Sequence, residues 1–260
     1  MIKDSLGDRM KHNYEEVYKA RLVRRMPVVI RLDGVAFHTF TRGFDKPFDK
    51  LMIKTMQQTM KYLCEHVQGC VFGYTQSDEI TLVLIDYAKL ESSAWFDYEV
   101  QKLVSVAASM ATFAFNKFFN RYCNVGESGE LKETDSNDSV QVAHQKAVRM
   151  GATFDARCFN VPKEEVVNCV LWRQKDAERN SVNSLAQHTF SHKELQGLSL
   201  VQTKEKMSVE AGVDWEALPT HLKLGSSCIK KDSCWVIDEN MPRLIGEDRH
   251  YLEDLINVGN

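Results

Sequence analysis

Hydrophobic and polar positions along residues 27–160 follow two different periods, one typical of strands and one typical of helices. The predicted elements are strands at 27–33, 71–75, 79–86 and 152–160 and helices at 48–67 and 94–121. The first strand is apolar and β-branched, which is typical of a central strand buried on both faces. The order β-α-β-β-α-β predicts an α+β fold with an antiparallel ferredoxin-like or polymerase-palm sheet and helices packed on one face.

The rest of the chain shows weaker patterns. The elements predicted there are a helix at 3–25, a loop at 124–146, and helices at 163–189 and 199–213 followed by a strand or turn region. The loop is predicted because Gly, Ser, Asn, Asp and Glu dominate its composition. We therefore expect one catalytic domain over 1–260, with a palm-like core at about 27–160 and a C-terminal helical and strand extension at about 163–260.

Composition places the chain in a broad class. The formal net charge of its 260 residues is −3, so a nucleic-acid partner would have to bind a local basic patch. No apolar run approaches the about 20 residues that span a bilayer, and no signal-peptide segment follows the N-terminus. The seven cysteines include no Cys-x-x-Cys pair, which favours free thiols in a reducing compartment. We expect a cytoplasmic protein without a membrane partner.

Two carboxylates carry the candidate chemistry. Asp33 ends the first predicted strand, and Asp78 lies at the bend of the predicted hairpin. In a split β-α-β sheet these positions are neighbours, and converging carboxylates bind Mg²⁺ together with substrate phosphates. The pattern predicts two-metal nucleotidyl transfer with Asp33 and Asp78 as catalytic carboxylates. Asp-Gly and Ser-Asp-Glu sequences also form ordinary turns, so the spacing alone leaves a purely local role open.

The residues around Asp33 favour phosphate binding. Gly34 has no Cβ, so its backbone can turn tightly and approach a metal or a phosphate. The next four residues present backbone N–H groups of the kind that cradle a triphosphate. The side chains that offer positive charge for the phosphates are Lys46, Arg24, Arg25 and Arg31.

Several blocks of sequence, taken together, resemble a known family. In chain order they are Ser5-Leu6-Gly7-Asp8-Arg9-Met10-Lys11, Arg31-Leu32-Asp33-Gly34-x-x-Phe37-His38-x-Phe40, Lys46-Pro47-x-Asp49, Gly73-Tyr74-Thr75-Gln76-Ser77-Asp78-Glu79-Ile80, Phe154-Asp155-Ala156-Arg157-x-Phe159-Asn160 and Trp172-Arg173-Gln174-x-Asp176-Ala177. They are similar to the tRNA-histidine guanylyltransferase family over nearly the whole chain.

The resemblance implies an enzyme that adds nucleotides to the 5′ end of a tRNA in the 3′→5′ direction, after activation of the 5′-monophosphate with ATP or GTP. It implies that Asp33 and Asp78 are side-chain ligands of two Mg²⁺ ions and that the Gly34 carbonyl is a third ligand. The implied nucleotide contacts are Asp33, Gly34, Val35, Ala36, Phe37, His38, Lys46, Asp49, Ser77 and Asp78. A homotetramer, built as a dimer of dimers, is the implied assembly.

One segment departs from the eukaryotic members of the family. Residues Glu178–Ser184 stand where those enzymes carry a His-Ile-Asn-Asn-Leu-Tyr-Asn run. This resembles the guanylyltransferase-like, 3′-5′ polymerase branch of bacteria and archaea, which implies template-dependent repair of truncated tRNA 5′ ends, with guanylate addition to tRNAHis as a further activity.

The RNA partner adds one more set of residues. The predicted tRNA-binding residues are Arg24, Arg25, Arg173, Lys175 and Arg179. Two other functions remain open from the residues alone. One is a palm-type nucleotidyl cyclase, which needs a single nucleoside triphosphate and no RNA. The other is a non-catalytic RNA-binding module that keeps the motifs as a scaffold.

Overall fold

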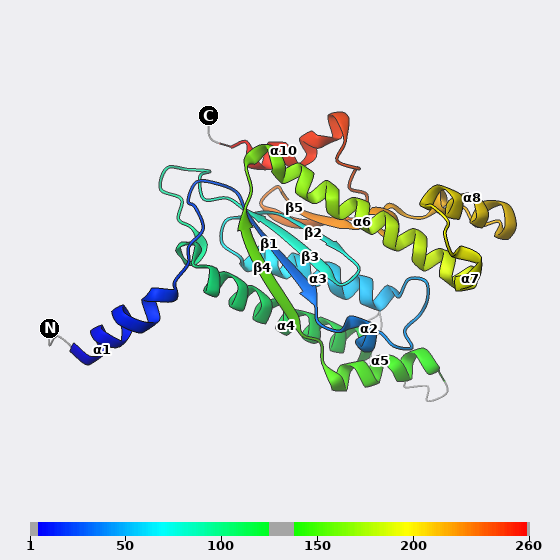
Figure 1. Cartoon of the computed structure of the whole chain (residues 1–260), viewed down its shortest axis with the longest axis horizontal. Helices are drawn as coiled ribbons and strands as arrows, with labels where there is room; N and C mark the ends of the chain where they lie inside the picture. Colours follow the sequence, from blue (N-terminus) through cyan, green and yellow to red (C-terminus); the bar gives the residue numbers. More distant parts are fainter. Residues whose placement is uncertain (1–4, 125–137, 259–260) are drawn as a thin grey trace.

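The structure is a computed structural model that describes residues 5–124 and 138–258. Its centre is an antiparallel six-stranded sheet with the strand order β4-β1-β3-β2-β5-β6 (Figure 1). The strands are β1 (Val28–Gly34), β2 (Cys70–Gln76), β3 (Glu79–Leu84), β4 (Phe154–Asn160), β5 (Ser226–Lys231) and β6 (Cys234–Asp238). The first four strands have the ferredoxin-like order, which confirms the predicted α+β fold.

Helices cover both faces of the sheet (Figure 1). They are α3 (Lys50–His66) and α4 (Val100–Asn124) on one face, and α6 (Lys163–Thr189) and α10 (His250–Ile256) on the other. Alternate residues of β1, such as Ile30 and Leu32, are buried in the core with α3 and α4. Phe72 and Tyr74 of β2 are buried in a second core with α6 and α10. The predicted core helices thus share one face, and the C-terminal extension covers the opposite face.

A third, smaller core lies in the C-terminal extension. Its elements are the second half of α6, α7 (His192–Leu195), α8 (Leu200–Ala211) and the 3₁₀-helix η4 (Trp215–Ala217). Val182, Met207 and Trp215 are buried there, and Phe48 from the loop before α3 packs against them. The helices predicted at 163–189 and 199–213 are therefore confirmed. Helix α9 (Thr220–Leu224) then leads into β5, and the 3₁₀-helix η5 (Gly246–Arg249) precedes α10.

The predicted N-terminal helix is too long. Helical structure runs through α1 (Ser5–Met10), a π-helical turn η1 (Lys11–Glu15) and a 3₁₀ turn η2 (Glu16–Tyr18), and it ends there rather than at residue 25. The chain then pairs with the start of the α4 region. Arg21 bridges to Glu99, and the Leu22 amide donates to the Tyr98 carbonyl at 3.0 Å. These tertiary bonds replace the helical ones that the apolar spacing predicted.

The predicted loop at 124–146 is partly wrong. Residues 125–137 lie outside the described part of the chain, but α5 (Ser139–Met150) occupies the remainder. Asp138 begins this helix by accepting hydrogen bonds from the amides of Val140 and Gln141. Ala147 of α5 is buried in the first core, and Ala143 and Val148 pack against that core, but the polar residues before the helix dominate the composition of 124–146.

The long apolar helix predicted at 94–121 is divided. A 3₁₀ turn, η3 (Trp95–Tyr98), comes first, and α4 begins at Val100. Phe96 and Asp97 have left-handed φ angles of 49° and 52°, which breaks the helix between the two elements. Among the described residues, no helix is long and apolar enough to cross a membrane.

Candidate active site

The pairing of β1 with β3 brings the two predicted catalytic carboxylates to the same end of the sheet. Asp33 lies opposite Glu79, and the Gly34 amide donates to the Asp78 carbonyl at 3.1 Å. Burial raises the pKa of Asp78, and the negative charge of Asp33 raises that pKa further. The two carboxylates therefore repel each other, which is the situation that a bound cation relieves.

Local structure explains why these residue types occupy this place. Ser77 and Asp78 form a two-residue hairpin turn in which Ser77 has a left-handed φ of 50°, and the Ser77 hydroxyl donates to Asp78 Oδ1 at 3.0 Å. A Cβ at Gly34 would lie 2.2 Å from the Phe37 ring. Only glycine therefore lets the chain turn this closely above the Phe37 side chain.

The donor set fits Mg²⁺. Asp33 makes no side-chain hydrogen bond or ion pair with another described residue, and Asp78 accepts only the local Ser77 hydroxyl and its own amide. Carboxylate and carbonyl oxygens are the ligands that this hard ion prefers, and it keeps further positions for phosphates and water. Within residues 5–124 and 138–258 there is no cluster of three or more His, Cys, Asp or Glu side chains that could hold a metal alone. Two carboxylates alone would leave Mg²⁺ positions open for substrate phosphates and water.

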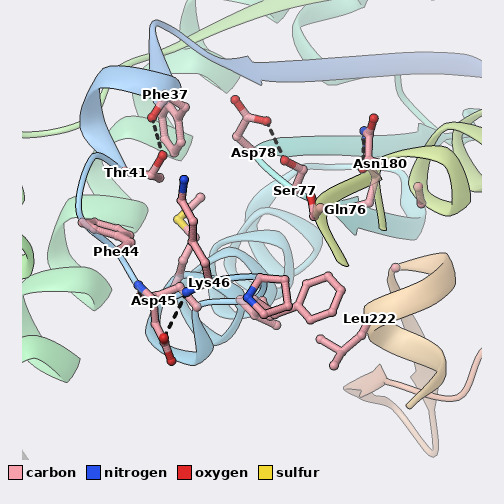
Figure 2. A pocket seen from close by; sticks show the side chains of 18 of the residues that line it. Phe37, Thr41, Phe44, Asp45, Lys46, Gln76, Ser77, Asp78, Asn180 and Leu222 are labelled. Atoms are coloured by element: carbon pink, nitrogen blue, oxygen red, sulfur yellow. Dashed lines mark hydrogen bonds between the residues drawn. The ribbon is translucent and has the colours of Figure 1, made fainter. Parts of the chain in front are cut away.

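A cavity of about 490 Å³ opens beside Asp78 (Figure 2). Six of the predicted nucleotide-binding residues line it, namely Phe37, His38, Lys46, Asp49, Ser77 and Asp78. The other four, Asp33, Gly34, Val35 and Ala36, are not part of its lining. Figure 2 shows Lys46 and Asp78 entering the cavity from different sides, so it offers a cation and a candidate metal ligand to the same occupant.

The predicted phosphate cradle is shorter than the sequence suggested. The amides of Gly34 and Val35 are used, because they donate to the carbonyls of Asp78 and Thr153. Ala36 has a left-handed φ of 54° and begins the short helix α2 (Phe37–Phe40). No hydrogen bond from the amides of residues 36–38 to another described residue is found. These three amides are the ones that remain for an anionic ligand.

Asp49 lines the cavity, but its oxygens already have partners within the protein. It begins α3 by accepting from the Met52 amide at 2.8 Å, and it accepts from the Asp45 amide at 3.0 Å. His144 Nε2 of α5 lies 2.8 Å from Asp49 Oδ2. Burial acts to raise the pKa of Asp49, but the hydrogen bonds from His144 and the two amides outweigh it and lower that pKa. Asp49 therefore positions the loop that carries Lys46.

Sequence reasoning missed one whole wall of the cavity. That wall consists of Ala177, Asn180 and Ser184 from α6 and His221, Leu222 and Gly225 from α9 and its end. The α6 residues recur at intervals of three and four, which places them on one face of a helix. Ala177 belongs to the block that resembles the family, and Asn180 and Ser184 lie in the segment 178–184 that differs from the eukaryotic members. Their helical spacing could therefore have indicated this wall of the cavity. Nothing in the pattern around residues 221–225 marked them as a wall of this cavity.

The predicted tRNA-binding residues are scattered, and two of them already pair with carboxylates of the protein. Arg24 lies beyond the opposite end of β1 from Asp33, where its Nε donates to Asp86 Oδ2 at 2.5 Å. Arg173 is only 5% exposed and forms ion pairs with Glu79 and Asp176. A buried guanidinium held by two carboxylates cannot contact a phosphate without breaking those pairs.

The other three residues of that set are exposed. Arg25 donates its amide to Asp86 beside Arg24, so it also lies far from the candidate metal ligands. Arg179 pairs with Asp176 on α6. Lys175 is exposed on the same helix. Arg25 and Arg179 therefore lie at different ends of the sheet, since Asn180 beside Arg179 donates to Gln76 at the Asp78 end.

The comparison with known proteins identifies the family. A sequence model of the tRNAHis guanylyltransferase family matches residues 7–162 of this chain. The chain belongs to the tRNAHis guanylyltransferase family. The predicted family is thereby confirmed, together with the class of tRNA nucleotidyltransferase that the family represents.

Solved structures extend the similarity to the full chain. A bacterial tRNAHis guanylyltransferase-like protein in complex with ATP has a TM-score of 0.82 and 36% identity, covering 98% of this chain and 100% of that one. The corresponding complex with GTP has a TM-score of 0.79 and 34% identity, with the same coverage. An uncharacterised protein of Acanthamoeba polyphaga mimivirus is 29% identical over 86% of this chain and 77% of its own length. The fold and the family therefore agree over both the core and the extension.

Proposed function

We propose that this protein adds nucleotides to the 5′ end of tRNA in the 3′→5′ direction, guided by the opposing base, and repairs truncated 5′ ends. The observation that carries the proposal is the meeting of Asp33 and Asp78 beside a cavity that also contains Lys46, in a member of the tRNAHis guanylyltransferase family. ATP and GTP are the proposed nucleotides, since the similar bacterial protein binds both. Guanylate addition to tRNAHis is a further activity of the same site.

The reaction proceeds in two transfers. A 5′-phosphate oxygen of the RNA attacks the α-phosphorus of ATP or GTP, and pyrophosphate leaves. The 3′-hydroxyl of an incoming nucleotide then attacks the activated 5′ phosphate, forming a phosphodiester bond and releasing AMP or GMP. Both transfers depend on positioning and on neutralising phosphate charge, so the protein needs cations and oriented N–H groups rather than a covalent nucleophile.

The residues of the site match those needs. Lys46 and the amides of Phe37 and His38 bind phosphate oxygens inside the cavity. Asp33 and Asp78, with the Gly34 carbonyl, are the residues that would hold two Mg²⁺ ions. When bound, Mg²⁺ lowers the pKa of an attacking hydroxyl and neutralises the leaving group. Asp49 and His144 hold the Lys46 loop against α3 and α5.

The decisive experiment uses a tRNA that lacks its first nucleotide. The protein is incubated with this RNA, Mg²⁺, ATP and all four nucleoside triphosphates, and the 5′ ends are sequenced. Addition restricted to the base that complements the acceptor strand is the expected result. Addition of any base without regard to the opposing one would contradict template dependence. A cyclic nucleotide product without RNA extension would contradict the transferase function and support a cyclase.

The assembly and location belong to the same proposal. We infer a cytoplasmic homotetramer. The support from this chain is the exposed apolar surface, which includes Tyr14, Tyr18 and Phe113 at 62%, 75% and 57% exposure. Light scattering of the purified protein should give four times the mass of one chain, and a monomeric mass would contradict the tetramer.

A further inference from the structure

One group of residues next to Asp33 has no role in the proposed nucleotide cavity. Arg31 lies two residues before Asp33 on β1, so both side chains emerge from the same face of the sheet. Arg157 of β4 is in register with Arg31 and therefore shares that face. Trp172 of α6 is 51% exposed, and the Arg31 guanidinium carbon lies 5.3 Å from the centre of its ring.

Of the two arginines in this group, only Arg157 has a carboxylate partner within hydrogen-bond distance. Two arginines directly opposite each other on neighbouring strands are destabilising unless a negative charge lies between or beside them. Arg157 donates to Asp155 at 3.0 Å, but this pair is about half exposed. Arg31 is only partly exposed, and its side chain makes no hydrogen bond or ion pair with another described residue. A partly desolvated guanidinium without a partner is a strong candidate for binding a phosphate.

The Trp172 indole is also accessible to a ligand. The guanidinium carbons of Arg31 and Arg173 lie 5.3 Å and 4.1 Å from the centre of its ring. About half of the indole nevertheless remains exposed. An exposed aromatic ring next to guanidiniums is the combination with which proteins stack a base and bind its phosphate.

The strand order separates this group from the nucleotide cavity. The cavity is lined by the β2–β3 hairpin, whereas Arg31 and Arg157 lie on β1 and β4. Because the order is β4-β1-β3-β2, Asp33 lies between the two. The cavity therefore lies on the β2 side of Asp33, and the group of Arg31, Arg157 and Trp172 lies on the β4 side.

We propose that Trp172, Arg31 and Arg157 form a 5′-end platform, in which the indole stacks on the terminal base of the RNA and the two guanidiniums bind its 5′ phosphate beside Asp33. This inference rests on the proposed function, because it assigns the RNA substrate to one side of the carboxylates. It also replaces the buried Arg173 as the expected contact with RNA.

The test uses an RNA hairpin with a 5′-monophosphate and 2-aminopurine as its first nucleotide. Fluorescence should fall when the wild-type protein binds, because the stacked base is quenched. Trp172→Ala should weaken binding about 10-fold or more and abolish the quenching, whereas Trp172→Phe should retain both to a large extent. Val209→Ala, at a 78% exposed position of α8, is the control and should bind like wild type.

The phosphate part of the proposal has its own measurement. Wild-type protein should prefer the 5′-monophosphorylated hairpin to a 5′-hydroxyl hairpin, and Arg31→Gln or Arg157→Gln should remove most of that preference. The dissociation constant of ATP should stay within about twofold in all these variants. Equal RNA binding by Trp172→Ala and wild type would overturn the platform. Equal weakening of ATP and RNA would also overturn it, because Trp172 would then belong to the nucleotide cavity.

A parallel assay of nucleotide addition separates the two proposals. If wild-type protein extends RNA but Trp172→Ala leaves the KM for RNA unchanged, the platform fails and the proposed function stands. If wild-type protein extends no RNA while quenching still depends on Trp172, the platform stands and the proposed function fails. Circular dichroism of each variant confirms that the exposed substitutions leave the fold intact.

Discussion

The two ends of the β1–β3 pair each place an aspartate beyond a buried strand, but the surroundings of these aspartates differ completely. At one end Asp86 is fully buried and accepts from Arg24 Nε at 2.5 Å and from the Arg25 amide at 2.8 Å. At the other end Asp78 faces Asp33, and no cationic side chain bonds to either carboxylate within the described residues. The same residue type therefore performs two different tasks on one pair of strands.

The difference shows how the fold separates structural charge from functional charge. A buried carboxylate that accepts hydrogen bonds from Arg24 and the Arg25 amide stabilises the contact between the N-terminal segment and the end of β3. Two partly buried carboxylates that repel each other cost stability unless a cation arrives. An unpaired cluster therefore marks the reactive end of the strands, and a fully paired one marks the structural end.

The largest effect is expected at the reactive end. Asp33→Asn or Asp78→Asn should lower nucleotide addition by about 10³-fold or more, because each removes a carboxylate from the candidate Mg²⁺ site. The fold should persist, since neither carboxylate bonds to a cationic side chain. Single-turnover addition to a 5′-truncated tRNA measures the loss. Turnover like that of wild type in either variant would show that the unpaired cluster is not the reactive one.

The same substitution at the structural end should affect stability instead. Asp86→Ala should lower the free energy of unfolding by about 2 kcal/mol, because the Arg25 amide and Arg24 Nε lose the fully buried carboxylate that accepts their hydrogen bonds. Urea denaturation followed by circular dichroism measures this. The specific activity of the folded fraction should remain close to that of wild type. A loss of activity without a loss of stability would show that Asp86 is not purely structural.

The dependence of stability on pH should distinguish the two ends more finely. The pKa of Asp78 is raised by burial and by Asp33, so its neutral form is favoured in the folded protein. Without Mg²⁺, the free energy of unfolding should therefore fall as pH rises from the ordinary aspartate pKa through the raised one. At pH 7, Asp78→Asn should melt about 2 °C higher than wild type, and Mg²⁺ should raise the melting temperature of wild type only. A lower melting temperature for Asp78→Asn would show that favourable contacts of the Asp78 carboxylate already outweigh its burial and its repulsion by Asp33.

The smallest effect concerns RNA at the structural end. Arg24→Gln should weaken tRNA binding by less than about threefold, because Arg24 is paired with Asp86 and Asp97 and lies far from Asp33. Filter binding at two salt concentrations measures this affinity and its salt dependence. A clear fall in the salt slope would show that Arg24 does contact a phosphate and that both ends of the strands face the RNA.

Much of the reactive end could be predicted from the sequence, for a physical reason. The alternation of apolar residues locates the strands, and the β-α-β-β-α-β order makes β1 and β3 antiparallel neighbours. The end of β1 and the start of β3, which carry Asp33 and Asp78, must then lie side by side. The cavity could be predicted only in part. Its wall of His221, Leu222 and Gly225 comes from a segment more than 140 residues from Ser77 and Asp78, and no local periodicity carries such a distance.

Charge partners were the least predictable feature. Arg24 and Arg173 looked like free cations for RNA because the sequence shows a residue's charge and not what neutralises it. Both are paired by carboxylates that are distant in the sequence, Asp86 for one and Glu79 for the other. Conversely, Trp172 belonged to a recognised motif, but only its exposure beside Arg31 indicates a task.

The sequence by itself determined the order of the first four strands, the family and the two carboxylates, because these depend on local periodicity and on short motifs that can be recognised without the surrounding structure. The tertiary structure alone decided which charges are paired, which amides are free and which side chains lie on either side of Asp33. Those properties depend on burial and on contacts between distant segments, and such contacts exist only once the sheet has formed.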